Sequence, residues 1–354
     1  MKERNPEPDC CDVSRRLFFQ TTAAVAVGST LPLFATAKAV AAPPTKTSVA
    51  ETAVKALFDS LSETQKKEIC FDWDYIDKDR GLLRTRVANN WQITKPTITS
   101  GYYTKAQQTI AHDIFRGLIN PDWYDRFLKQ LKDDNEGKPW GTFQSIAIFG
   151  TPGSEQFEFV MTGRHQTLRA DGNTEKHVAF GGPIFYGHAA KGFNEEKDHP
   201  GNVFWPQALA ANKVYTMLDE KQRKAALVEK SPQESHVAFR GEKLAKVPGL
   251  AVKEMSSDQK TEMQSVLAKL IEPFRAEDRE EALECVKVQG GLDKCRLSFF
   301  EDKDIGEDKV WDNWRLEGPS FVWYFRGRPH VHVWVHVADS SEVKLNSYQN
   351  SVGV

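Results

Sequence analysis

The sequence predicts an α+β protein with two antiparallel β-meanders and helices packed around them. Helical patterns mark residues 51–68 and 104–133, with an extended or irregular stretch at 71–91 between them, whereas short apolar or alternating runs separated by turn residues fill 142–180 and 295–337. A regular strand–helix–strand alternation, which a parallel sheet would need, is missing from the sequence. The 354 residues are ample for a large core. We therefore expect a single domain over 51–340, or alternatively a helical sub-domain at 51–140 and a mixed one at 141–340.

The N-terminus does not read as part of this fold. Arg15 and Arg16 precede Leu-Phe-Phe and a weakly apolar run, and Ala37-Lys-Ala39 offers a small-residue cleavage site. Residues 1–39 resemble a twin-arginine signal peptide. The resemblance implies the twin-arginine translocase as a partner and a periplasmic or extracellular location. Residues 40–50 then read as a linker and 341–354 as a C-terminal tail.

Capping signals mark where the helices begin. Ser62 and Thr104 are each followed three residues later by Gln, and Asn120 precedes a proline, so each position is expected to start a helix. The expected helices are 51–61, 62–68, 104–118, 120–133, 206–219, 220–230, 256–271 and 276–286.

Turn residues divide the remaining segments into strands. Thr-Pro-Gly-Ser separates two apolar runs and predicts a hairpin. The sequence has no internal repeat of useful period: His-Val-Ala-Phe occurs at 177 and again at 236, but this is an isolated match. The expected strands are 142–149, 155–162, 166–169, 177–180, 183–187, 295–301, 311–316, 320–326 and 330–337, and 193–200 is expected to be a polar loop.

The last of these strands carries an unusual pattern of histidines. In 330–337, valines point to one face, and His330, His332, Trp334 and His336 to the other. Two imidazoles at i and i+2 on a rigid strand can bind one metal ion. The competing interpretation is an antiparallel strand with one solvated face, where alternation is also expected.

Other polar residues at strand ends are candidates for the same site. His165 follows Arg164 at a glycine turn, and His188 ends a strand in the same way. We expect His330, His332, His165 and His188 to hold the metal. Glu317 would act as an acid or base, and Arg315 or Arg164 would orient a polar or anionic substrate.

The lack of a cysteine pair suited to metal binding narrows the choice of metal. A cluster of three or four histidines without a thiolate suits copper, zinc or iron, and three ligands with an open position would make the site catalytic. Cys285 and Cys295 flank a Gln-Gly-Gly turn and are expected to form a disulfide in an oxidising compartment, which would leave Cys70 unpaired and buried.

Charge and motifs exclude several classes of protein. The net charge of −2 provides no basic surface for nucleic acid. Motifs for a nucleophile elbow, a phosphate loop, a dinucleotide site or an HExxH zinc site are missing from the sequence. No segment after the signal is long and apolar enough to span a membrane.

Taken in order, these motifs resemble the bacterial family called domain of unknown function 3500. The resemblance rests on Ile146–Gly150, Gly163-Arg-His165, Gly187-His188, Arg315–Pro319 and Pro329-His-Val-His332, and it covers about residues 51–340. It implies that His165 matches the second His of the family's Gly-His-His, with Arg164 replacing the first, and that His330 and His332 match its His-x-His. Here Trp334-Val-His336 replaces the Arg-Asp-Pro run of many members, so His336 would substitute for a lost polar group.

Three hypotheses follow. The leading one is an exported metal-dependent enzyme that carries out either hydrolysis or oxidation at copper or iron. The alternative is a periplasmic ligand- or metal-binding protein without turnover. The third is a structural or interaction protein whose His face is solvated surface.

Overall fold

A computed structural model describes residues 41–188, 203–234, 237–303, 310–343 and 346–347. The described residues belong to the unit Val40–Val354. The proposed signal peptide and the polar loop at 193–200 lie outside them. Among the described residues, no helix is long and apolar enough to cross a membrane.

The first half of the chain places its helices before its meander. Capping boxes begin two of its helices, at Ser62 and Thr104, as the sequence predicts. The helices are α1 (Val49–Ser60), α2 (Glu63–Ile69), α3 (Lys105–Leu118) and α4 (Pro121–Asp134). The strands are β1 (Cys70–Phe71), β2 (Ile76–Asp77), β3 (Gly81–Leu82), β4 (Arg86–Val87), β5 (Ser145–Gly150), β6 (Phe157–Gly163), β7 (Gln166–Ala170) and β8 (Ile184–His188).

The second half repeats this order of elements. The helices are α5 (Trp205–Met217), α6 (Glu220–Ala226), α7 (Ser257–Ile271) and α8 (Ala276–Val288). The strands are β9 (Leu227–Val228), β10 (Leu250–Ala251), β11 (Arg296–Phe300), β12 (Asn313–Glu317), β13 (Phe321–Arg326), β14 (Val331–Val337) and β15 (Asn346–Ser347).

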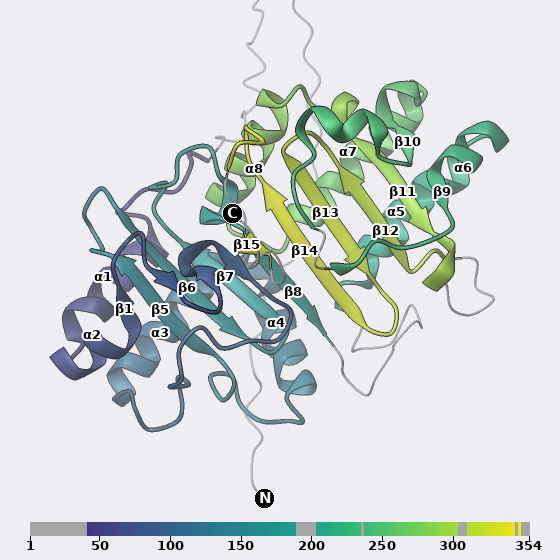
Figure 1. The fold of residues 1–354 in the computed structure, drawn as a ribbon. Helices are drawn as coiled ribbons and strands as arrows, with labels where there is room; N and C mark the ends of the chain where they lie inside the picture. The colour runs from purple at the N-terminus through teal and green to yellow at the C-terminus, as the bar shows by residue number, and fades with distance from the viewer. Residues whose placement is uncertain (1–40, 189–202, 235–236, 304–309, 344–345, 348–354) are drawn as a thin grey trace, which may run out of the picture. The chain divides into compact units, whose positions relative to one another are not determined.

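One large sheet joins the two meanders (Figure 1). Its order is β1-β5-β6-β7-β8-β14-β13-β12-β11-β10, and β9 also pairs with β11. The pairs within and between the meanders are antiparallel, whereas β1 and β9 add in parallel at β5 and β11, so the sheet is mixed. The predicted α+β class with two antiparallel meanders is confirmed.

The pairing pattern relates the two halves by a pseudo-two-fold axis. At the centre of the sheet, Ile184 of β8 lies opposite Val335 of β14. The turn β6–β7 is Arg164-His165, and its counterpart β12–β13 is Pro319-Ser320. When the paired positions are followed outward from these turns, Ile184 of the first half corresponds to Val335 of the second half. These two residues also pair with each other, as positions on a two-fold axis must. The bridge between Ile119 and Phe274, one residue before each N-cap of α4 and α8, has the same property.

A pair of glutamines in each half shows how closely the halves correspond. The side chains of Gln65 and Gln107 exchange two hydrogen bonds of 2.9 and 3.0 Å. Gln222 and Gln259 exchange two bonds of the same lengths. All four glutamines are the N3 residues of capping boxes. The expectation that the chain has no useful internal repeat was therefore wrong. We call residues 49–188 the first repeat and 205–338 the second repeat.

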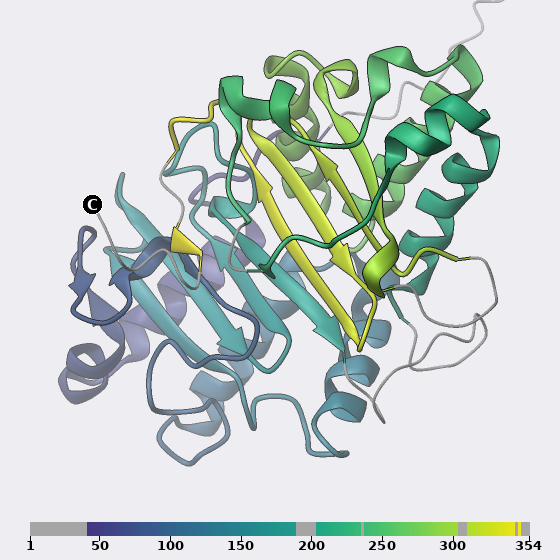
Figure 2. The same cartoon turned by 45° about the vertical axis from the view of Figure 1, so that its right-hand side comes forward.

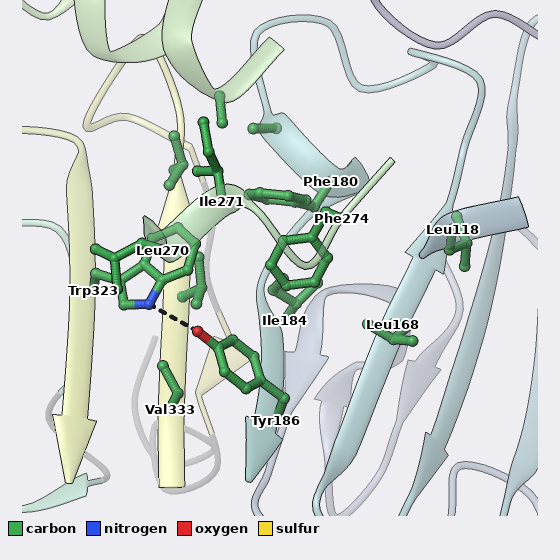
Figure 3. Close-up of a cluster of buried hydrophobic side chains, with 14 of the residues drawn as sticks. Leu118, Leu168, Phe180, Ile184, Tyr186, Leu270, Ile271, Phe274, Trp323 and Val333 are labelled. Atoms are coloured by element: carbon green, nitrogen blue, oxygen red, sulfur yellow. Dashed lines mark hydrogen bonds between the residues drawn. The ribbon is translucent and has the colours of Figure 1, made fainter. Parts of the chain in front are cut away.

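The helices cover one face of the sheet and enclose the main hydrophobic core. Val331, Val333, Val335 and Val337 point into this core, as predicted for the valine face of β14. Near the pseudo-two-fold axis, the Trp323 indole donates a 3.1 Å hydrogen bond to the Tyr186 hydroxyl among apolar side chains from both repeats (Figure 3).

Irregular segments cover the other face (Figure 2). Leu83, Ile93 and Trp91 pack over the first meander, whereas Val237 and Phe239 pack over the second. His332, Trp334 and His336 are consequently 3%, 0% and 1% exposed. The interpretation of the histidine face as solvated surface was therefore wrong. The ring nitrogens of a buried imidazole need partners within the protein, whereas those of an exposed imidazole can bind water.

Three local expectations also differ from the structure. The run 177–180 is not a strand: a short 3-10 helix forms at Ala179–Gly181, with Phe180 at a φ of 63°. Cys285 and Cys295 are free thiols, each near a different backbone carbonyl, of His177 and Gly291 respectively. Cys70 is also free but only partly buried.

Candidate metal centre

Three histidines from two distant parts of the chain meet on the face of the sheet that the irregular segments cover. We call this the covered face, as opposed to the helix face. His165 is the second residue of the β6–β7 turn, where its φ of 51° is a left-handed conformation that His tolerates better than most residues. Its backbone N–H donates to Asn90 Oδ1 at 2.9 Å, which fixes the turn. His332 lies in β14, and His330 immediately precedes that strand.

Their Nε2 atoms converge on one point. His332 Nε2 lies 3.0 Å from His165 Nε2 and 2.8 Å from His330 Nε2. The ligating nitrogens of all three lie within 4.8 Å of one another. His165 and His332 are 2% and 3% exposed, whereas His330 is partly exposed and leaves the group accessible from one side.

Two carboxylates contact the opposite nitrogens of these rings. Asp134 Oδ2 lies 2.5 Å from His165 Nδ1, and Glu234 Oε2 lies 2.7 Å from His332 Nδ1. A carboxylate only accepts hydrogen bonds, so each Nδ1 must carry the ring proton. A neutral imidazole has one such proton, and the Nε2 of both rings therefore presents a lone pair. Two lone pairs facing each other at 3.0 Å repel unless a cation lies between them.

The surroundings favour the neutral form of two of these imidazoles, His330 and His332. Burial, followed by the charges of His165 and Arg326, lowers the pKa of His330 to about 4. Burial and the nearby Arg326 also lower the pKa of His332 well below its ordinary value. Neutral imidazole is the form that binds a metal, so His330 and His332 are in the form that suits a metal ion.

His188 lies on the other face of the sheet. It pairs with Val331 of β14, whereas its neighbour Gly187 pairs with His332. Because side chains on paired positions share a face, His188 points with Val331 toward the helices, where its ring stacks near Phe204. The metal-binding group formed by the described residues contains His165, His330 and His332 but not His188.

Glu317 and Arg315 share the covered face but lie on β12, two strands from β14 and so roughly 10 Å away. They bind each other at 2.6 Å, and Arg240 also donates to Glu317 at 2.6 Å. Arg164 is closer to the histidines: its Nε lies 3.3 Å from Asp134. His336 is buried near Phe239, and burial lowers its pKa to about 3.

Sequence reasoning missed Asp134 and Glu234. Asp134 is the last residue of α4, and Glu234 lies in an irregular segment, so neither stands near a histidine in the sequence. The internal repeat offered one signal. The second repeat has Gln289 and Ser320 where the first has Asp134 and His165, and Gln289 Oε1 accepts the Ser320 backbone N–H at 3.0 Å. The contact between helix end and turn recurs, but among the described residues the metal-binding group forms at the first-repeat contact and not at the second.

Comparisons with known proteins are consistent with the resemblance drawn from the motifs. No curated protein and no solved structure matches the chain. The model of a family described as "Protein of unknown function (DUF3500)" matches residues 44–337, a span that includes the first repeat, all but the last residue of the second repeat, and all three histidines. The chain therefore belongs to the DUF3500 family.

Proposed function

We propose that this protein is an exported enzyme that uses one transition metal ion, held by His165, His330 and His332, to activate water for hydrolysis. The observation that carries the proposal is the 3.0 Å approach of two Nε2 lone pairs whose Nδ1 protons are fixed by Asp134 and Glu234. Zinc is the metal we favour. Three imidazoles with an open position and carboxylates behind the rings form a common arrangement for catalytic zinc.

Each residue has a definite task in this proposal. His165, His330 and His332 would hold the metal ion, which would supply Lewis-acid chemistry for hydrolysis. His330, the partly exposed ligand, would mark the side from which substrate enters. Asp134 and Glu234 would hold two rings in the tautomer that binds the metal. Phe185 of β8, whose ring centroid lies 5.1 Å from that of His332, would shield the site from water on the side of the sheet.

Metal content tests the proposal directly. The full chain, exported with its own signal and purified without a tag, would be examined by elemental analysis beside a His330→Ala/His332→Ala variant. We expect about one equivalent of metal in the wild type and none in the variant, with the same circular dichroism. Ser320→Ala is the matched control, because Ser320 occupies the position of His165 in the second repeat.

The outcome also separates the enzyme from its alternatives. Copper or iron in place of zinc would redirect the proposal to oxidation. A wild type that stays metal-free after reconstitution with zinc, copper and iron would contradict it and favour a binding protein without turnover.

Export is a separate part of the proposal and rests on residues 1–39 alone. We expect the change Arg15→Lys/Arg16→Lys, which preserves charge, to leave the protein in the cytoplasm, whereas Lys38→Gln should not. Cell fractionation measures this. Equal export of both variants would rule out the twin-arginine route.

A further inference from the structure

Each carboxylate behind the metal ligands also binds an arginine. Asp134 contacts His165 through Oδ2 and Arg164 through Oδ1, at 2.5 and 3.3 Å. Glu234 likewise contacts His332 through Oε2 at 2.7 Å, and Arg326 through Oε1 at 2.8 Å. Two chains of arginine, carboxylate and imidazole therefore converge on the same point.

These chains determine the charge around the proposed metal. The two carboxylates carry a formal charge of about −2, and the two guanidinium groups restore it to zero, since Arg stays protonated in proteins. Imidazole ligands bind a metal ion in their uncharged form, so the three histidines would add no charge to the centre. A divalent ion would therefore keep its full positive charge, and its field would be weakly screened because Asp134 and Arg326 are 2% and 7% exposed. Such a centre favours an anion at the open position.

A hollow of about 440 Å³ lies beside the same turn. Two of the residues that line it belong to the site: Arg164 precedes His165, and Asn90 accepts the His165 backbone N–H. The Arg164 side chain is 39% exposed, so its contact with Asp134 leaves part of it accessible. Trp91 and Phe143 add flat apolar surfaces to the hollow. Trp91 is held in place by its indole N–H, which donates to Thr167 Oγ1 at 2.9 Å.

We propose that the substrate class is a carboxylate on a flat apolar body. Its oxygen occupies the open position of the metal, Arg164 contacts the same carboxylate, and Trp91 and Phe143 pack against the body. This inference rests on the proposed metal site. Arg164 is a specificity-determining residue in it, because a guanidinium matches the planar shape of a carboxylate.

Cobalt substitution tests the inference, because the visible spectrum of bound Co²⁺ reports both the metal and its fourth ligand. The full-length protein loaded with Co²⁺ would be titrated with benzoate, acetate and benzyl alcohol. We expect benzoate to change the spectrum at about tenfold lower concentration than acetate, since burying an aromatic ring adds more than 1.4 kcal/mol. Benzyl alcohol, which has the ring but no charge, should leave the spectrum unchanged.

Three variants assign the contacts. With Co²⁺ saturating, Arg164→Met should weaken benzoate and acetate binding about tenfold, as expected for the loss of one charged hydrogen bond. Trp91→Leu should weaken benzoate binding and leave acetate unchanged. Arg116→Met, which removes an exposed arginine of α3, is the control and should bind both anions as the wild type does.

The readouts separate the inference from the proposed function. A protein that gives no cobalt spectrum overturns the metal site and the inference with it. A normal cobalt spectrum that benzoate and acetate both leave unchanged overturns the inference alone. Equal affinity for benzoate and acetate overturns the role of Trp91 and Phe143, and an unchanged Arg164→Met variant overturns the role of Arg164.

Discussion

His165 and His332 face each other through Nε2 atoms 3.0 Å apart, although 166 residues separate them in the sequence. One comes from the β6–β7 turn of the first repeat, and the other from β14 of the second. Their remaining nitrogens are occupied by carboxylates from a helix end and an irregular segment. This arrangement determines which substitutions should affect metal binding and which should affect only folding.

Asp134→Asn should weaken metal binding by about 10- to 100-fold, the usual effect of removing a carboxylate behind a histidine ligand. The amide keeps the volume but no longer requires the proton to be on Nδ1 of His165. Competition with a chromogenic chelator measures the affinity. Gln289→Ala, at the equivalent helix end, should lower stability yet leave the affinity within twofold. Equal effects of the two changes on affinity would refute the role of Asp134.

Glu234→Gln should weaken metal binding to a similar degree, since it removes the negative charge behind His332, and an amide no longer requires the ring proton to be on Nδ1. The Trp334 indole N–H donates to Glu234 Oε2 at 3.2 Å, and the amide oxygen can still accept this bond. Isothermal titration with zinc would quantify the loss. A variant in which the affinity is unchanged and only the melting temperature falls would assign Glu234 a structural role.

His188→Ala should retain a full equivalent of metal, because His188 lies on the helix side of the sheet. We expect it to lower the free energy of unfolding by about 1–3 kcal/mol through lost packing at a fully buried position. Elemental analysis and urea unfolding would be read together. Loss of metal without loss of stability would return His188 to the ligand set.

Stability should fall as pH rises from about 5 to 9. Burial, followed by the charges of Asp171 and Asp278, raises the pKa of Glu281 from 4.5 to about 9. In this range the folded protein keeps a proton that the unfolded chain has lost, so the free energy of unfolding decreases by up to about 1.4 kcal/mol per pH unit. Urea unfolding at several pH values measures the slope. Glu281→Gln should flatten it, whereas the exposed control Glu284→Gln should not.

The repeat makes a prediction about stability as well. Gln107→Ala and Gln259→Ala should each cost about 1–3 kcal/mol, because each leaves buried polar groups without a partner. Their effects should agree closely, since the two glutamines make equivalent bonds. Gln264→Ala, on the exposed side of α7, is the control and should change stability by less than about 0.5 kcal/mol. Very different costs for Gln107 and Gln259 would argue against equivalent packing.

Local patterns made much of the fold predictable from the sequence. The capping glutamines that follow Ser62 and Thr104 predicted where two helices begin. The alternation after Pro329 predicted β14 with its valines in the core. His330 and His332 were identified by their two-residue spacing on one face of a strand, and His165 because polar residues at strand ends often build sites.

The rest depended on pairing that no local pattern reveals. His188 had the same strand-end signal as His165, but the register of β8 against β14 puts it on the opposite face. A shift of one residue would have reversed that result. The repeat was detectable in principle, because Leu61-Ser-Glu-Thr-Gln-Lys-Lys and Leu218-Asp-Glu-Lys-Gln-Arg-Lys align with matched caps. A second pair of matched caps begins α3 and α7, at Thr104 and Ser256, and the strand register shows the rest of the correspondence.

The origin of the ligands has a consequence for how the molecule holds together. His165 and Asp134 belong to the first repeat, and His330, His332 and Glu234 belong to the second, so neither repeat could bind the ion alone. A bound metal would act as a cross-link over the seam between β8 and β14, and its binding free energy would count toward keeping the two repeats joined. Two identical copies of such a repeat would build this centre twice. The described residues contain it once, and Gln289 and Ser320 lie at the positions that correspond to Asp134 and His165.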